Sequence, residues 1–164
     1  AFTELYPAFL RRGTRTVKAC LPAGCELQTC RYDINLEPEA QGFQAETFDA
    51  ALSVNTLHLA ADLVASLGAL RRLLRPAGAL VISELVRPGP SSGVHLELPF
   101  TLLEAFRRTP LDGLRQRPGF LTLDGWLVAL ERAGFSSHAL IPAAFRRCAQ
   151  LYPGFYCCAI IARR

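Results

Sequence analysis

The chain has 164 residues, of which 51% are hydrophobic and 20% charged, a composition that excludes a disordered chain and fits one domain with a sizeable core. The formal net charge is only +4, and no basic stripe is interleaved with aromatic residues, so nucleic-acid binding is not expected. No apolar run approaches the ~20 residues of a membrane span, and the N-terminus does not resemble a signal peptide, so we expect no membrane partner.

Residue usage adds two expectations. Methionine is absent and Lys18 is the only lysine, which predicts that the chain does not begin at a natural initiator and is an excised part of a larger protein. The cysteines lack the paired spacing of a zinc site. We therefore expect no metal centre but buried free thiols in a reducing cytoplasm at Cys20, Cys25, Cys30, Cys148, Cys157 and Cys158.

The first third of the chain predicts two strands and a short helix. Ala1–Leu5 fits the end of a strand, and Pro7 suits the first turn of a helix that ends near Gly13. The alternating segment Cys25–Ile34 predicts a strand that stops at Asp33. A polar, turn-rich loop follows.

The middle of the chain predicts two buried strands with a helix between them. Phe48–Val54 and Gly78–Val86 are near-continuous apolar runs, typical of parallel strands buried on both faces under helices. Between them, Asp62–Leu74 carries an apolar stripe at helical spacing. The Pro-Gly turn of residues 75–78 is expected to end that helix.

The last third predicts two helices and two strands. Leu96–Arg107 is expected to be helical, and residues 109–119 irregular. A helix over Gly125–Ala133 is expected, capped by Thr122 or Asp124 at its start and by Gly134 at its end.

Ser137–Ile141 and Phe155–Ala162 predict an antiparallel closing pair of strands. Because strands alternate with helices along the chain, the fold class is α/β.

A polar residue follows or ends each of the two apolar strands: His58 comes shortly after the first, and Glu84 closes the second. The carboxyl ends of parallel strands collect ligands and catalytic groups at one edge of a sheet. An imidazole titrates near neutrality and suits proton abstraction, and a carboxylate on its other nitrogen fixes the tautomer. The sequence therefore predicts a general-base pair.

One expected part of such a sheet is missing. A nucleotide-binding sheet begins with a strand and a glycine-rich turn that packs a helix N-terminus against the cofactor. No such turn precedes Phe2. We expect the central first strand and its glycine-rich loop to lie outside this chain.

Five segments of the chain are informative when read in order: AFTELYPAFL, RYDINLEPEAQGF, FDAALSVNTLHLAADL, LRRLLRPAGALVISEL and LTLDGWLVALERAGF. In this collinear order they resemble a class I S-adenosylmethionine-dependent methyltransferase, and more closely the C-methyltransferase domains of polyketide synthases. The resemblance covers nearly the whole chain. It implies a Rossmann-like methyltransferase sheet that is incomplete at its N-terminal side, with residues 1–164 as a single partial domain of a multidomain synthase.

The resemblance also implies roles for individual residues. Glu4 matches the acid that holds the ribose hydroxyls of S-adenosylmethionine, Asp33 the acid near the adenine, and Asn55 a position lining the same cleft. His58 matches the catalytic base, and Glu84 the carboxylate that orients it. The implied reaction is S-adenosylmethionine-dependent methylation of the α-carbon of a β-ketoacyl thioester. The implied partners are an acyl carrier protein bearing that thioester and the other domains of the synthase.

The chain departs from the family in two places. The glycine-rich first motif and an N-terminal lid are absent, so the chain alone is expected to bind S-adenosylmethionine poorly. The segment Arg87–Gly119 lacks the family's tryptophan-containing stretch. The details of the substrate pocket therefore do not carry over from the family.

Three other functions are compatible with parts of the sequence to different degrees. An inactive pseudo-methyltransferase, like the scaffold domain of animal fatty acid synthase, is an alternative that the His58 and Glu84 pair disfavours. A nicotinamide-dependent reductase would need a G-x-G-x-x-G turn and a Tyr-Lys pair, but Lys18 is the only lysine. O- or N-methylation stays open because the fold does not fix the acceptor atom.

Overall fold

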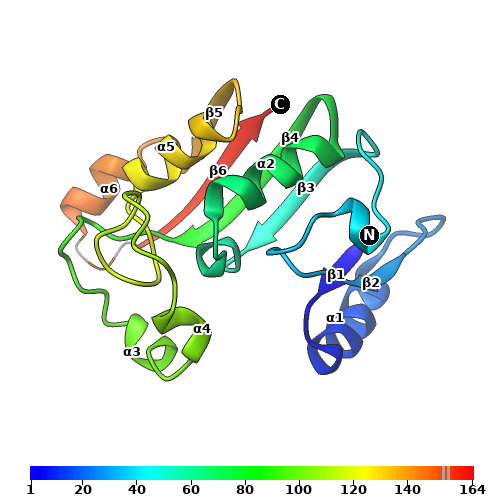
Figure 1. Cartoon of the computed structure of the whole chain (residues 1–164), viewed down its shortest axis with the longest axis horizontal. Coiled ribbons are helices and arrows are strands. Elements are labelled where there is room, and N and C mark those ends of the chain that lie inside the picture. Colours follow the sequence, from blue (N-terminus) through cyan, green and yellow to red (C-terminus); the bar gives the residue numbers. More distant parts are fainter. Residues whose placement is uncertain (153, 155) are drawn as a thin grey trace.

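The strands form two separate sheets in the computed structural model, which describes residues 1–152, 154 and 156–164. A two-stranded sheet pairs β1 (Phe2–Glu4) with β2 (Thr29–Arg31), and a four-stranded sheet has the order β3-β4-β6-β5 (Figure 1). The strands of the larger sheet are β3 (Phe48–Val54), β4 (Leu74–Leu85), β5 (Ser137–Ile141) and β6 (Cys157–Arg163). The α/β class is confirmed, and within the described residues no strand joins the two sheets.

Strand directions agree with the sequence prediction. β3 pairs with β4 in parallel, whereas β6 pairs antiparallel with both β4 and β5. The closing antiparallel pair is therefore confirmed, although the predicted first residue of its second strand, Phe155, lies outside the described residues. The strand predicted from Gly78 instead begins at Leu74, because Leu74 pairs with Phe48 before a register shift in the ladder. The Pro-Gly segment is thus part of β4.

Two elements in the first third have different lengths from those predicted. The helix α1 runs from Pro7 to Cys20 and passes through Gly13 without ending. A side chain at Gly13 would collide with the ring of Phe2, so this glycine allows close packing of α1 on β1. Strand β2 is shorter than the predicted Cys25–Ile34, because β1 offers only three residues for pairing.

Two longer helices, α2 (Leu63–Leu73) and α5 (Leu123–Arg132), pack against each other and cover one face of the larger sheet (Figure 1). Both helices begin at a side-chain cap, of which only the one of α5 at Thr122 was predicted. The side chain of Asp62 accepts a hydrogen bond from the main-chain N–H of Ala65, and that of Thr122 accepts one from Gly125. Gly134 ends α5 with a φ of 87°, a left-handed conformation that glycine adopts without steric cost.

The remaining helices are short. The prediction of one continuous helix over Leu96–Arg107 is wrong, since residues 101–103 are not helical and separate two short helices. Helix α6 was not predicted. These elements are η1 (Glu39–Gln41), η2 (Leu57–Leu59), α3 (Glu97–Phe100), α4 (Glu104–Arg107) and α6 (Phe145–Leu151).

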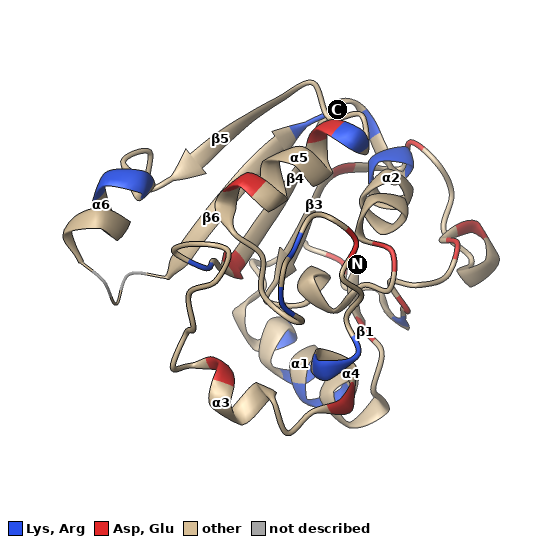
Figure 2. Ribbon diagram, turned by 60° about the vertical axis from the view of Figure 1, so that its left-hand side comes forward, with Lys and Arg blue, Asp and Glu red and all other residues tan. Residues whose placement is uncertain are grey.

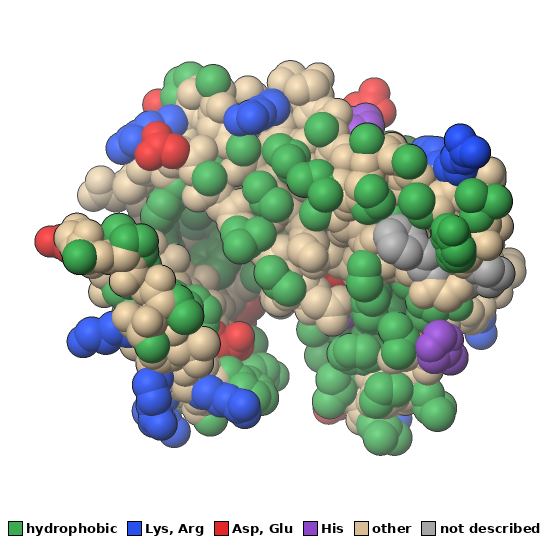
Figure 3. Space-filling model, turned by 180° about the vertical axis from the view of Figure 1, so that it is seen from behind, with side chains coloured by type: hydrophobic (Ala, Val, Ile, Leu, Met, Phe, Trp, Pro, Cys, Tyr) green, Lys and Arg blue, Asp and Glu red, His purple; other side chains and the backbone are tan. Residues whose placement is uncertain are grey.

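The core lies between α2, α5 and the larger sheet, with Trp126, Leu67, Leu80 and Ile82 fully buried. The other face is different. On β3, Leu52 is 70% and Val54 60% exposed, and Figure 3 shows apolar side chains over this side of the molecule. The prediction that β3 is buried on both faces is therefore wrong for the described residues, because their helices cover one face only.

Several expectations about the surface can also be compared with the structure. All six cysteines are free thiols, but only Cys158 is buried, so the prediction of buried thiols is wrong for the others. Burial raises the pKa of Cys158 to about 11.

None of the helices in the described part of the chain combines the length and apolar character that a membrane crossing requires. Basic side chains gather on α1 (Figure 2).

Candidate active site

The carboxyl ends of β3 and β4 bring the predicted general-base pair together. β3 ends at Val54, and Asn55 then turns the chain with a φ of 48° while its N–H donates to the carbonyl of Ser83 at 2.7 Å. This turn leads directly into η2, which carries His58. Because Ser83 precedes Glu84 on β4, the turn sets η2 beside the Glu84 carboxylate.

His58 and Glu84 form a buried hydrogen-bonded pair. Nδ1 of His58 lies 2.9 Å from Oε2 of Glu84, and the two residues are 1% and 3% exposed. The other carboxylate oxygen, Oε1, accepts a hydrogen bond from the main-chain N–H of Thr56 at 3.0 Å. Both carboxylate oxygens therefore have donors, and the pair is fixed by the main chain as well as by its own contact.

The chemistry of this contact assigns the tautomer of His58. An ionised carboxylate only accepts hydrogen bonds, so Nδ1 carries the proton and Nε2 carries the lone pair. Nε2 is buried and has no hydrogen-bond partner among the described residues. The arrangement leaves a basic nitrogen free to accept a proton while a carboxylate supports the opposite side of the ring.

Aromatic rings enclose His58. The ring centroid of Phe120 lies 4.5 Å from that of His58 and that of Phe106 lies 5.8 Å away. Phe100 packs on both of these phenyl rings. Gly119, with a φ of 88°, lies so close to Phe106 that a side chain would overlap the ring. The segment from α3 to residue 120 thus covers the base.

The two predicted nucleoside-binding acids lie at the ends of the two strands of the smaller sheet. Glu4 ends β1 and pairs in register with Arg31 of β2, and Asp33 follows two residues later. Since the strands are parallel, both acids emerge at the same edge. Oε1 of Glu4 accepts hydrogen bonds from the N–H groups of Leu5 and Tyr6.

Asp33 lies beside an open cavity of about 310 Å³, lined also by Arg31, Leu36 and Gln41. The Gln41 side chain accepts from the Asp33 N–H at 2.7 Å and donates to the Asp33 carbonyl at 2.9 Å. Gln41 therefore binds both main-chain polar groups of Asp33. The lining of the adjacent cavity is polar except for Leu36. This lining suits the flat, polar-edged base of a nucleoside.

Asn55 is the predicted cofactor residue of the larger sheet. Its Oδ1 atom is buried without a hydrogen-bond partner among the described residues, and such an acceptor is costly to leave unpaired. The structure brings Asn55 together with His58 and Glu84, and places Glu4 and Asp33 at the other sheet. The loop after β2 links the two groups, since Asn35 Oδ1 accepts a hydrogen bond from Ala61 N–H at 2.7 Å.

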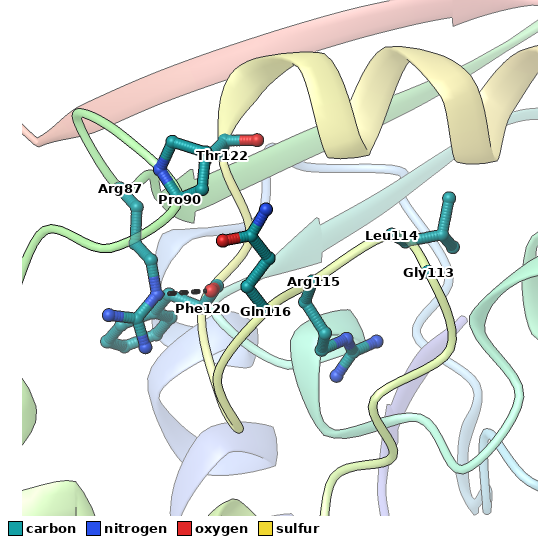
Figure 4. Close-up of a pocket in the computed structure, with 8 residues that line it drawn as sticks. All are labelled: Arg87, Pro90, Gly113, Leu114, Arg115, Gln116, Phe120 and Thr122. Atoms are coloured by element: carbon teal, nitrogen blue, oxygen red, sulfur yellow. Dashed lines mark hydrogen bonds between the residues drawn. The ribbon is translucent and has the colours of Figure 1, made fainter.

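Two arginines near the base were not predicted. Arg87 donates from Nε to the carbonyl of Phe120 at 2.8 Å and forms a buried ion pair with Glu97. Arg115 donates from Nη1 to the carbonyl of His58 at 2.9 Å. Figure 4 shows both residues around a cavity of about 90 Å³, with the Arg115 guanidinium turned away from Arg87 and Gln116.

Burial lowers the pKa of both guanidinium groups, partly opposed by the carboxylates beside them. A signal for Arg87 was present in the sequence, because a cation directly follows the apolar run of β4. No local pattern marks Arg115, which lies in the irregular segment 109–119.

Comparison with known proteins agrees with this architecture. A family model described as a methyltransferase domain matches residues 14–82. The highly reducing polyketide synthase otaA of Aspergillus carbonarius is 30% identical over 141 residues, which cover 85% of this chain and 5% of that protein. The highly reducing polyketide synthase ACRTS2 of Alternaria alternata is 41% identical over 73 residues, covering 44% of this chain and 3% of that protein. The chain therefore spans only a small part of these relatives.

Solved structures are similar over the full length of the chain. The trans-methyltransferase CalH, solved in complex with SAH, is 28% identical with a TM-score of 0.76, over 99% of this chain and 41% of that chain. The DszA carbon methyltransferase is 26% identical with a TM-score of 0.78, over 99% and 39%. The CurJ carbon methyltransferase shares the fold with a TM-score of 0.80 at 24% identity, over 99% and 40%.

Proposed function

We propose that this chain, a methyltransferase similar to the C-methyltransferase domains of polyketide synthases, takes part in methylating the α-carbon of a β-ketoacyl thioester. The thioester is carried by an acyl carrier protein, and the other domains of the same synthase are its partners. The observation that carries the proposal is the buried His58–Glu84 pair with Nε2 of His58 left free.

The residues at the two sheets fit the methyl donor. Glu4 and Asp33, at the ends of adjacent parallel strands, would hold the nucleoside, and the unpaired Oδ1 of Asn55 would face the same donor. S-adenosylmethionine, when bound, supplies an electrophilic methyl group on sulfonium. No other part of the cofactor's site is assigned to this chain.

His58 and Glu84 supply the proton chemistry. The α-carbon between a ketone and a thioester becomes nucleophilic when it loses a proton, and Nε2 of His58 accepts that proton. Glu84, hydrogen-bonded to Nδ1, stabilises the imidazolium that forms. The intact pair favours an active domain over a pseudo-methyltransferase scaffold, which has no need to keep a base with a free nitrogen.

A product assay tests the proposal. The intact protein that carries this chain is incubated with S-adenosylmethionine and a synthetic β-ketoacyl thioester, and the product is examined by mass spectrometry and NMR. We expect a methyl group on the α-carbon. Methylation on oxygen or nitrogen would exclude the carbon acceptor, and cofactor binding without any methyl transfer would support the scaffold function.

Replacing Glu84 with glutamine should slow methyl transfer by about 10–10²-fold, as when other partners that orient a functional imidazole are changed. The amide can still accept from Nδ1, but it carries no charge to stabilise the imidazolium. The loss should be smaller than that from removing His58, as measured by single-turnover methylation. A Glu84→Gln variant slower than one without His58 would contradict the orienting role.

A further inference from the structure

Arg115 holds an unusual position for a charged side chain. Its side chain is only 1% exposed, although it comes from an irregular segment between α4 and α5. Nη1 donates to the main-chain carbonyl of His58 at 2.9 Å. The guanidinium therefore reaches from one loop into another and contacts the residue that carries the free base.

The rest of the guanidinium is poorly satisfied. Nη2 lies 3.6 Å from Oδ2 of Asp112, beyond hydrogen-bond distance, and Nε has no acceptor among the described residues. A buried cation with so few partners is costly. Burial lowers the pKa of Arg115, while the negative charges of Asp112 and then Glu84 oppose that effect. Arg115 and Glu84 are connected through His58, whose carbonyl accepts a hydrogen bond from Arg115 and whose Nδ1 hydrogen-bonds to Glu84.

We propose that Arg115 is a positioning residue for the His58–Glu84 pair, which fixes the main chain at His58 through its hydrogen bond to the His58 carbonyl. The inference rests on the function proposed above. Among the described residues, the donors to Glu84 are the main chain of Thr56 and the His58 ring. The geometry of the pair therefore depends on how the main chain at His58 is held.

The proposed proton transfer leaves the net charge of the site unchanged. Before it, Arg115 is positive, Asp112 and Glu84 are negative, and His58 and the thioester are neutral. When the bond from the α-carbon to hydrogen breaks, the proton forms a bond with Nε2 and the electron pair moves to the enolate oxygen. The imidazolium and the enolate that form carry opposite charges and offset each other. Buried sites tolerate charge only when it is paired in this way.

The anchoring contact has a geometric effect as well. The hydrogen bond to the His58 carbonyl holds η2 at a second point, in addition to the hydrogen bond of Asn55 at the turn before it. Without it, the ring can shift relative to Glu84 and the α-carbon. A displacement of about 1 Å at a reacting group can cost about 10²-fold in rate.

The test compares Arg115→Met, Arg115→Lys and the matched control Arg117→Met in the intact protein that carries this chain. Methionine removes the charge and the donors, whereas lysine keeps a cation and one donor able to reach the His58 carbonyl. Arg117 is exposed on the same segment, and its guanidinium donates to the carbonyl of Ser91 at 3.3 Å. Single-turnover methyl transfer, the Kd for S-adenosylmethionine and the proton NMR signal of the His58 Nδ1–H are measured for each.

We expect Arg115→Met to lower the methyl-transfer rate by about 10²-fold, with the cofactor Kd unchanged and the Nδ1–H signal shifted or broadened. Arg115→Lys should keep at least about a tenth of the rate, and Arg117→Met should match the unchanged protein. If Arg115→Met does not fold, the lysine variant decides the matter. The inference fails if Arg115→Met keeps more than a third of the rate, if rate and cofactor affinity fall together, or if a folded Arg115→Lys loses about 10²-fold.

Failure of this inference is distinguishable from failure of the proposed function. If the Arg115 variants methylate normally while a variant without His58 does not, His58 keeps its proposed role as general base and the positioning role of Arg115 is wrong. If a variant without His58 also methylates normally, the proposed function itself is wrong.

Discussion

Replacing His58 with alanine in the intact protein should reduce methyl transfer by about 10²–10⁴-fold, the usual contribution of a general base. The physical reason is that Nε2 of His58 is the free basic nitrogen beside the Glu84 carboxylate, and no other described group offers a paired imidazole. The affinity for S-adenosylmethionine should stay nearly the same, because the acids assigned to the cofactor belong to the other sheet. Rapid-quench methylation and calorimetric titration of the cofactor measure the two effects separately.

Two further variants make this result interpretable. His58→Ala leaves the buried Glu84 carboxylate without one of its donors, so His58→Gln, whose amide can still donate to Glu84, separates loss of the base from loss of folding. His138→Ala is the matched control, since His138 is exposed on β5. Normal methylation by a folded His58 variant would show that His58 is not the general base.

Replacing Arg87 with methionine should lower the free energy of unfolding by about 3–5 kcal/mol, because it leaves the Glu97 carboxylate buried without its cation. The guanidinium also donates to the carbonyls of Phe120, Ser92 and Pro118, at 2.8, 2.9 and 2.9 Å. All three guanidinium nitrogens therefore have acceptors. This one side chain holds the segment before α3 to the segment before α5. Urea unfolding of the protein, followed by circular dichroism, measures the change.

The charge pair can be tested further by a double substitution. Adding Glu97→Leu to Arg87→Met removes the orphaned carboxylate, so part of the lost stability should return. Arg117→Met should change stability by no more than about 0.5 kcal/mol, as is usual for an exposed side chain. Equal stability of the Arg87 and Arg117 variants would show that the ion pair does not hold these loops.

Local patterns allowed much of the scaffold to be predicted. The apolar run of β3, the helical stripe of α2 and the cap at Thr122 each depend on nearby residues, and all are confirmed. The errors arose where tertiary contacts decide. The end of α1 is not set by Gly13, because that glycine serves its contact with Phe2, and the start of β4 follows from its pairing with Phe48.

The candidate site divides in the same way. His58 and Glu84 could be selected because each follows or ends an apolar strand, and the contact between them is present. Their roles, and those of Glu4, Asp33 and Asn55, remain predictions. Arg115 could not be found in advance, since its contact with His58 spans 57 positions in the chain. Long-range contacts of loop residues leave no periodic trace in a sequence.

The phenyl rings of Phe100, Phe106 and Phe120 give the site a chemical property beyond shape. A carbanion formed next to water takes back a proton far sooner than it meets an electrophile. Apart from the Glu84 carboxylate at Nδ1, the His58 ring packs against phenyl rings, and the residue itself is 1% exposed. Under the proposed function, an enolate formed beside this ring would be shielded from protonation by bulk water. The aromatic enclosure would therefore lengthen the life of the nucleophile.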